Sequence, residues 1–175
     1  EGYVRIGLDH FALPSDELAI AQAEGRLRRN FQGYTTDAAR TLLGLGASAI
    51  GSLPQGYVQN VTQELPWRAA VSGGELPIAR GVLLTDDDRF RAEIIGRLMC
   101  DLSVDLAGVC AAHHRALGDL SEAVEKLKEF QRDDLVTFDG SRLSVSETGR
   151  LVVRSICAAF DTYFAAAEGR HSKAI

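Results

Sequence analysis

The chain has 175 residues, of which 46% are apolar and 25% are charged, and its formal net charge is −5. That length suits one ordinary domain, or one small domain with part of another. The acidic residues are spread along the chain, which argues against a nucleic-acid surface because such surfaces gather Lys and Arg. No apolar run approaches the roughly 20 residues of a membrane span, and no secretory signal opens the chain, so we expect a cytoplasmic protein without a membrane partner.

The first third of the chain follows the order strand, helix, loop, strand. Residues 3–8 are expected to form a buried strand, and residues 13–25 a helix that begins at a Pro-Ser pair and ends at a glycine. An irregular loop over 28–36 leads to an apolar, strand-like segment over 41–53, whose glycines mark close approach of the backbone to another group. This order is typical of an α/β barrel or a doubly wound sheet.

The rest of the chain is expected to be mainly helical. The expected elements are a short helix over 59–70 that Pro66 breaks, an extended piece over 79–85, helices over 86–101, 104–115 and 119–132, a hairpin around Asp139-Gly140, and a closing helix capped by Ser146. Helix, helix, hairpin, helix is the outline of a winged-helix module. We therefore predict an α+β fold, mainly helical, with a domain boundary between residues 1–77 and 78–175.

The usual catalytic motifs are absent from the sequence. There is no G-x-S-x-G, H-E-x-x-H or C-x-x-C, and no phosphate loop, so no residue is predicted to be catalytic. Cys100, Cys110 and Cys157 are interpreted as buried reduced thiols and not as metal ligands. His113 and His114 are neighbours in a helix and cannot converge on one metal, so we predict no metal site.

Two further features leave alternatives open. Asp9-His10 ends a strand, where α/β sites lie, but the pair can equally hold the following loop by hydrogen bonds. The winged-helix outline raises a nucleic-acid-binding function. Residues 119–154, however, include eight acidic and six basic residues, which is a net charge of −2. This charge favours a packing or lid domain over a nucleic-acid-binding one.

The segment Arg28–Thr36 is the most unusual stretch of the chain, with the sequence RRNFQGYTT. It contains an aromatic ring for stacking, an amide for hydrogen bonding and two adjacent guanidinium groups, but no nucleophile. Arg28 and Arg29 are either solvated or suited to a ligand that carries carboxylates, because the planar guanidinium fork binds a carboxylate in bidentate fashion. Residue chemistry alone does not name that ligand.

Four sequence blocks carry a family resemblance. They are IGLDHFALPSDELAIAQAEGRLRRNFQGYTT, LLGLGASAIGSL, YVQN and TGRLVVRSICAAFDTYF. Over essentially its whole length the chain resembles the C-terminal portion of the oxygen-independent coproporphyrinogen III oxidases, which are radical S-adenosylmethionine enzymes of haem biosynthesis. Because the chain opens at Glu1 and its single methionine is Met99, we also expect it to be a piece of a longer protein.

The resemblance implies a reaction and its cofactors. Enzymes of this family oxidatively decarboxylate two propionates of coproporphyrinogen III to vinyl groups, giving protoporphyrinogen IX, with S-adenosylmethionine and a [4Fe-4S] cluster. The matching positions imply that Phe31, Gln32 and Ile50 contact S-adenosylmethionine, and Arg28 and Arg29 become candidates for binding the propionates of the substrate.

The resemblance also implies an incomplete enzyme. The family's cluster motif, C-x-x-x-C-x-x-C, is missing, so this chain alone is expected to bind no cluster and to be inactive. Residues 1–77 would end a partial (β/α) barrel, and residues 78–175 would form a helical, winged-helix-like closing domain. The expected partners are coproporphyrinogen III and the N-terminal remainder of the polypeptide, and the complete protein is expected to be a monomer. Haem chaperones of the same fold are the main alternative, although they depart from the NFQGYTT pattern that is intact here.

Overall fold

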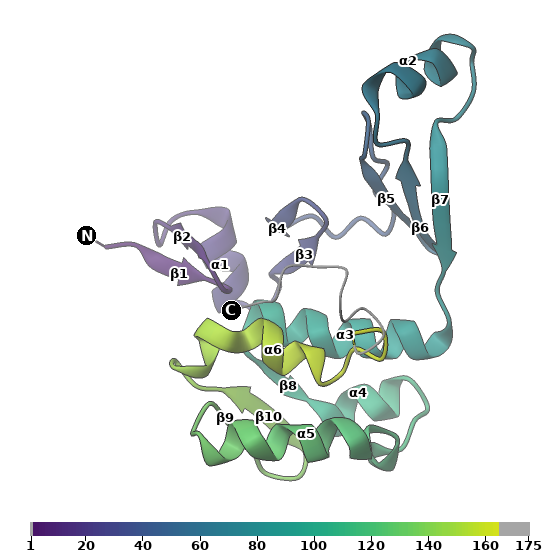
Figure 1. The fold of residues 1–175 in the computed structure, drawn as a ribbon. Helices are drawn as coiled ribbons and strands as arrows, with labels where there is room; N and C mark the ends of the chain where they lie inside the picture. The colour runs from purple at the N-terminus through teal and green to yellow at the C-terminus, as the bar shows by residue number, and fades with distance from the viewer. Residues whose placement is uncertain (1, 165–175) are drawn as a thin grey trace. The chain divides into compact units, whose positions relative to one another are not determined.

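The computed structural model describes residues 2–164 and has an α+β fold, which confirms the predicted class (Figure 1). Over those residues it contains six α-helices and small, open antiparallel sheets of two or three strands. The chain divides into two compact units. The first combines Glu1–Thr36 with Phe90–Ile175, and the second is Asp37–Arg89. The expected division at residue 78 stays a prediction about the domains of the complete protein, and residues 165–175 lie outside the described range.

The N-terminal part of the first unit is two small hairpins around a helix. Its elements are β1 (Val4–Ile6), β2 (His10–Ala12), α1 (Glu17–Ala23), β3 (Arg28–Asn30) and β4 (Gly33–Thr35). The expected helix is confirmed: the Asp16 carboxylate accepts a hydrogen bond from the Leu18 amide at its start, and Gly25, with φ +65°, follows its end. Buried apolar side chains, including Ile6 and Leu27, hold α1 against β1.

The segment Arg28–Thr36 is a hairpin and not the irregular loop that its sequence predicted. Its two strands have only three residues each, which is too short for a visible alternation of polar and apolar residues. The turn is set locally: the Asn30 side chain accepts a hydrogen bond from the Gln32 amide at 2.8 Å, and Gly33 supplies a φ of +130°. Phe31 and Gln32 therefore form the tip of the hairpin.

The second unit is a three-stranded antiparallel sheet with one helix. Its elements are β5 (Ile50–Leu53), β6 (Gly56–Asn60), α2 (Glu64–Ser72) and β7 (Ile78–Leu83), and β6 is the central strand. The prediction that Pro66 breaks a helix over 59–70 was wrong. The helix begins at Glu64, so Pro66 lies in its first turn, where a missing amide hydrogen costs no helical hydrogen bond.

The helical part of the first unit surrounds a second three-stranded sheet, of order β8-β10-β9 (Figure 1). Its elements are α3 (Asp86–Asp101), β8 (Ser103–Asp105), α4 (Leu106–Ala112), the 3-10 turn η1 (Leu117–Leu120), α5 (Ser121–Arg132), β9 (Val136–Phe138), β10 (Arg142–Val145), the 3-10 turn η2 (Gly149–Val152) and α6 (Val153–Ala158). Helix α3 and the hairpin at Asp139-Gly140 are confirmed. The expected helix over 104–115 is wrong at its start, because β8 pairs with β10 there.

The closing helix is shorter than its amphipathic pattern predicted. The Ser146 hydroxyl accepts a hydrogen bond from the Gly149 amide at 3.0 Å, but Ser146 is not the cap that was expected, because the N-cap residue is Thr148 and its side chain makes no capping hydrogen bond. The first turn is a 3-10 turn over Gly149–Val152, and only Val153–Ala158 is α-helical. Gly149 packs against the backbone of Leu135, and an added Cβ would lie 1.9 Å from the Leu135 carbonyl oxygen. This backbone contact fixes how the helix enters the core.

One large apolar core lies between these helices and the sheet. It includes the fully buried side chains of Phe90, Leu127 and Phe160. The three cysteines are all buried and unpaired, as the sequence predicted. Among residues 2–164, no helix is both long enough and apolar enough to cross a membrane.

Candidate cofactor and substrate site

The tip of the β3–β4 hairpin presents the two residues that were predicted to contact S-adenosylmethionine. The Phe31 side chain is 48% exposed, and Gln32 is exposed beside it. The local Asn30–Gln32 turn holds both residues at the tip of a short hairpin. An exposed aromatic ring next to an exposed amide can stack on a heterocycle and hydrogen-bond to its edge.

Tyr34 anchors this hairpin to the rest of the first unit. Its hydroxyl accepts a hydrogen bond from the Leu8 amide at 2.9 Å and donates one to the Met99 carbonyl at 3.0 Å. The hydroxyl therefore joins the hairpin to the turn after β1 and to the end of α3. Burial raises the pKa of Tyr34, so the phenol keeps the proton that it donates.

The two adjacent arginines of the hairpin lie on opposite faces. Arg29 pairs with Tyr34 across the strands, whereas Arg28 pairs with Thr35, and successive residues of a strand point to opposite sides. The Arg29 guanidinium accordingly lies over the Tyr34 ring, 5.8 Å from its centroid. Nothing in the sequence distinguished Arg28 from Arg29, whereas the hairpin register places their side chains on opposite faces.

The turn between β1 and β2 is held from three sides. The Gln22 side chain accepts from the Gly7 amide at 2.8 Å and donates to the Arg5 carbonyl at 2.9 Å. Arg150, which is only 7% exposed, donates to the Gly7 carbonyl at 2.6 Å and to the Arg5 carbonyl at 2.9 Å. Gly7 has a φ of +51°, and a Cβ there would lie 2.1 Å from the Tyr34 ring, so only glycine fits. These hydrogen bonds therefore fix the backbone that leads to Asp9 and His10.

Asp9 and His10 form a polar cluster with two arginines. The His10 Nδ1 lies 2.9 Å from an Asp9 carboxylate oxygen, and the Arg154 guanidinium lies 3.9 Å from the other oxygen. The His10 ring meets the Tyr34 ring edge-on, with 5.2 Å between centroids. The hydrogen bond from His10 has the largest effect and lowers the pKa of Asp9. Burial opposes this effect, and the charges of His10, Arg154 and Arg29 lower the pKa further.

Sequence reasoning missed Arg154 altogether. It follows Arg150 by four residues, so helical spacing could have suggested that the two side chains point to the same side of the expected closing helix. Nothing local could have identified that neighbour, since Asp9 lies 145 positions earlier in the chain.

Ile50, the third predicted cofactor contact, belongs to the second unit. It is the first residue of β5, is half-buried, and pairs with Gln59 of β6. The glycine-rich run before it has a structural role within this unit: an added Cβ on Gly44 would lie 2.9 Å from the Ile50 backbone. The Asn60 side chain fixes the same run by donating to the Gly44 carbonyl at 3.1 Å and the Gly46 carbonyl at 2.8 Å. Ile50 is therefore held in a defined strand.

The cysteines do not fit an iron–sulfur cluster. Cluster ligands are thiolates that converge on one site, whereas burial raises the pKa of Cys100 to about 11 and that of Cys157 to about 12. Within residues 2–164, no three His, Cys, Asp or Glu side chains are grouped so that they could hold a metal. His113 does not converge with His114, and its Nε2 lies 2.8 Å from a carboxylate oxygen of Glu93.

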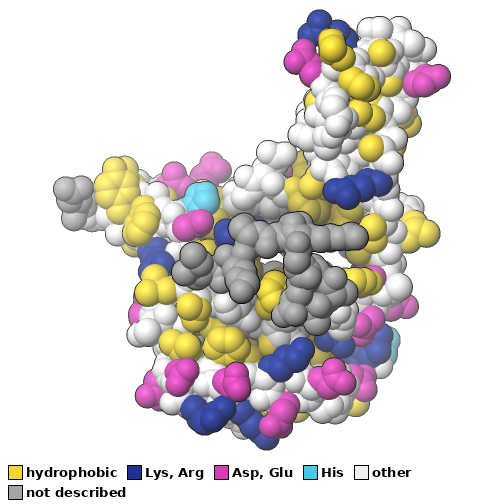
Figure 2. Space-filling view, in the orientation of Figure 1, with side chains coloured by type: hydrophobic (Ala, Val, Ile, Leu, Met, Phe, Trp, Pro, Cys, Tyr) yellow, Lys and Arg dark blue, Asp and Glu magenta, His cyan; other side chains and the backbone are white. Residues whose placement is uncertain are grey.

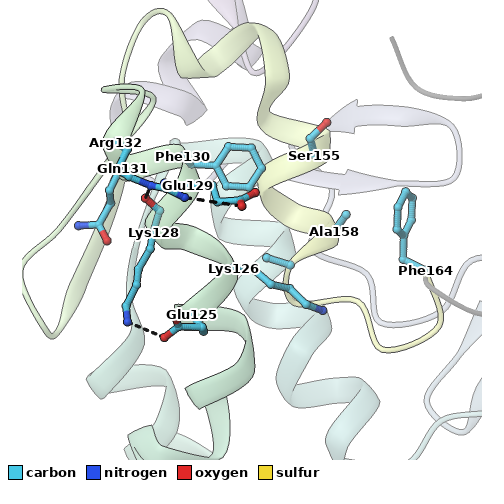
Figure 3. Close-up of a pocket in the computed structure, with 11 residues that line it drawn as sticks. Glu125, Lys126, Lys128, Glu129, Phe130, Gln131, Arg132, Ser155, Ala158 and Phe164 are labelled. Carbon is cyan, nitrogen blue, oxygen red and sulfur yellow. Dashed lines mark hydrogen bonds and ion pairs between the residues drawn. The ribbon is translucent and has the colours of Figure 1, made fainter.

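A separate groove of about 1030 Å³ lies between α5 and α6 (Figure 3). Phe130 and Phe164 give it apolar walls, and charged side chains of α5 line its rim. Those rim charges largely neutralise one another, since Lys128 lies 2.5 Å from Glu125 and Arg132 lies 3.6 Å from Glu129. None of the site residues predicted from the sequence lines this groove.

Comparison with known proteins shows which family of domains this chain resembles. Residues 84–152 match the family model described as the HemN C-terminal domain. The structure of coproporphyrinogen III oxidase (HemN) from Escherichia coli, described as a radical SAM enzyme, matches with a TM-score of 0.88 and 40% identity. That match covers 93% of this chain and 38% of the other.

Curated relatives point to the same proteins. The oxygen-independent coproporphyrinogen III oxidase of Bradyrhizobium diazoefficiens is 49% identical over 174 residues, which are 99% of this chain and 39% of the relative. The enzyme of that name from Pseudomonas aeruginosa is 41% identical, over 93% of this chain and 35% of its own length. Residues 84–152 are thus similar to the HemN C-terminal domain, and the resemblance of the chain to part of the oxygen-independent coproporphyrinogen III oxidases is confirmed. The chain spans less than two-fifths of their length.

Proposed function

We propose that this chain is the C-terminal part of an oxygen-independent coproporphyrinogen III oxidase. The complete protein oxidatively decarboxylates two propionates of coproporphyrinogen III to vinyl groups and so produces protoporphyrinogen IX for haem biosynthesis. The observation that carries this proposal is the 49% identity to a relative of that name over 99% of the chain. The fold agrees, with a TM-score of 0.88 to a HemN structure.

In this proposal, Phe31, Gln32 and Ile50 contact S-adenosylmethionine. The exposed ring of Phe31 offers a stacking surface, the Gln32 amide offers a donor and an acceptor, and Ile50 offers a strand backbone with an apolar side chain. When bound, S-adenosylmethionine and a [4Fe-4S] cluster supply the radical chemistry. The cluster is assigned to the remainder of the polypeptide, because the cysteines of this chain do not fit it.

The N-terminal remainder of the polypeptide is the proposed partner of the second unit. In that unit apolar side chains are visible on the surface where Figure 1 labels α2 and β7 (Figure 2). The large, strongly exposed ones are Leu43, Leu45, Leu65, Leu76, Val82 and Leu83. An apolar surface of this kind marks an interaction site. We therefore take residues 1–77 as the end of a partial (β/α) barrel, which the remainder completes, and residues 78–175 as a winged-helix-like closing domain.

Substitution of Gln32 tests the assignment of the hairpin tip. In the complete protein, Gln32→Ala should lower anaerobic conversion of coproporphyrinogen III by about 10-fold or more, since it removes a hydrogen bond to a group that must be positioned for reaction. The absorbance of the cluster should stay at the parent level. A variant that fails to assemble its cluster would instead give the hairpin a structural role.

A haem titration of the same protein separates the oxidase from a haem chaperone. The oxidase proposal expects consumption of coproporphyrinogen III and no tight stoichiometric binding of haem. Tight stoichiometric haem binding without consumption of coproporphyrinogen III would reject the oxidase in favour of the chaperone.

A further inference from the structure

We propose that Arg29 and Arg154, gathered around Asp9 and His10, form a carboxylate-binding site on the first unit. The ligand class is a tetrapyrrole carrying carboxylates, and the site holds one of those carboxylates while reaction takes place elsewhere. This inference rests on the proposed function and deepens it, because it names residues that recognise the substrate.

The geometry brings side chains from three separate segments to one place. Arg29 comes from β3, Asp9 and His10 from the turn before β2 and its first residue, and Arg154 from α6. Tyr34 is the common platform, since its ring lies 5.8 Å from the Arg29 guanidinium and 5.2 Å from the His10 ring centroid. The Arg154 guanidinium approaches from the other side of Asp9, at 3.9 Å. All of these residues lie within one compact unit.

The charges of the cluster do not balance. The Asp9 carboxylate lies 3.9 Å from the Arg154 guanidinium, and the charge of Arg29 also acts on it, so one negative charge is set against two positive charges and the cluster keeps a surplus positive charge. The side chains of Asp9, His10 and Arg154 are 56%, 53% and 60% exposed, and Arg29 is exposed as well. A dissolved anion can therefore reach them. Planar guanidinium groups favour a carboxylate, which they bind through paired hydrogen bonds.

The support beneath the cluster is rigid. Arg150 is buried and donates to the carbonyl groups of Arg5 and Gly7, while Gln22 and the Tyr34 hydroxyl take up the amide hydrogens of Gly7 and Leu8. A binding group held in place before the ligand arrives loses little conformational entropy when it binds. An exposed ion pair that only decorated the surface would need no such support. The same hairpin carries Phe31 and Gln32, so a carboxylate bound here would lie in the same unit as these two of the three proposed cofactor contacts.

The test uses the complete protein with its cluster and coproporphyrin III, the stable oxidised form of the proposed substrate. Its dissociation constant is measured by fluorescence for the parent protein and for Arg29→Gln and Arg154→Gln. Each substitution should raise the dissociation constant about three- to tenfold, as expected for loss of one partly exposed charge-assisted contact. Arg154→Lys, which keeps the charge but not the fork, should recover part of the loss.

Two further variants separate ligand binding from a merely structural ion pair. Arg132→Gln removes one exposed arginine from α5, outside the cluster, and should leave the dissociation constant unchanged. Asp9→Asn removes the carboxylate that competes with the ligand for the arginines, so it should lower the dissociation constant about two- to threefold. If the Asp9–Arg154 pair only shaped the surface, Asp9→Asn would weaken binding as Arg154→Gln does.

The proposal is overturned if both arginine variants bind coproporphyrin III within twofold of the parent, or if the parent does not bind it. A separate measurement decides the proposed function: the parent either converts coproporphyrinogen III to protoporphyrinogen IX or does not. A parent that converts the substrate while both variants bind normally refutes only the carboxylate site.

Discussion

The two compact units of this chain differ in what they do with their apolar side chains. The first buries a continuous core that includes Phe90, Leu127 and Phe160, each with no exposed surface. The second, Asp37–Arg89, is described throughout, and no hydrophobic side chain within it is buried. Its sheet is held mainly by backbone pairing and by the buried amide of Asn60. The first unit is thus stabilised by its own core, whereas the second exposes apolar surface that another segment can cover.

Truncating the core of the first unit should have the largest effect. Phe90→Ala removes a fully buried ring from the main core and should destabilise the chain by about 3–5 kcal/mol. Urea unfolding, followed by circular dichroism, measures the change in the free energy of unfolding. A loss below about 1 kcal/mol would show that this core does not stabilise the unit.

Filling the tight turn after β1 should have the next largest effect. Gly7→Ala places a Cβ against the Tyr34 ring at a backbone φ of +51°, so we expect a loss of about 2–3 kcal/mol. Gly25→Ala is the matched control, because Gly25 has a φ of +65° with open space around it and should lose only about 1 kcal/mol. Equal losses for the two variants would mean that the Tyr34 contact is unimportant.

Leu65 tests whether the exposed apolar surface of the second unit is covered in the complete protein. Leu65 is 77% exposed, so Leu65→Ala should change the stability of this chain by less than about 0.5 kcal/mol. In the complete protein, where we propose that the remainder covers this surface, the same substitution should cost about 2 kcal/mol. Denaturant titrations of both forms measure the difference. Equal small values in the two forms would leave the second unit without its proposed partner.

The smallest expected effect concerns pH. The pKa of Asp9 is lowered in the folded protein, mainly by the hydrogen bond from His10; the charges of His10, Arg154 and Arg29 lower it further against the opposing effect of burial. A lowered pKa means that the ionised carboxylate contributes stability above its unfolded pKa, and that this contribution disappears as the pH falls through the folded pKa. Carboxyl NMR titration should place the pKa of Asp9 below its ordinary value, and Arg154→Gln should raise it. An unchanged pKa in that variant would mean that Arg154 does not act on Asp9.

Local signals in the sequence predicted part of the fold well. The aspartates at the start of α3 and the Asp139-Gly140 turn determine their elements within a few residues, and both predictions are confirmed. The strands β3 and β8 were missed because each has three residues, too few to show a period. The prediction that Pro66 breaks a helix was wrong because a proline is tolerated in the first turn of a helix and disrupts only later turns.

Residue chemistry by itself drew attention to the candidate site only in the segment Arg28–Thr36, whose residues are adjacent in the sequence. Phe31 and Gln32 lie together at the hairpin tip, and their contact with S-adenosylmethionine stays a prediction, as does that of Ile50. The division of Arg28 from Arg29 follows from strand register, which a three-residue strand does not reveal. The Asp9–Arg154 contact joins two ends of the chain, and only the tertiary fold can bring them together.

The most direct test of the proposed function is product analysis of the complete protein under anaerobic conditions. Purified protein with its cluster, S-adenosylmethionine and a reductant is supplied with coproporphyrinogen III, and the tetrapyrroles are separated by chromatography after oxidation. The proposal predicts that protoporphyrin IX accumulates as coproporphyrin III disappears. Unchanged coproporphyrin III, from a protein with an intact cluster and bound S-adenosylmethionine, would contradict it.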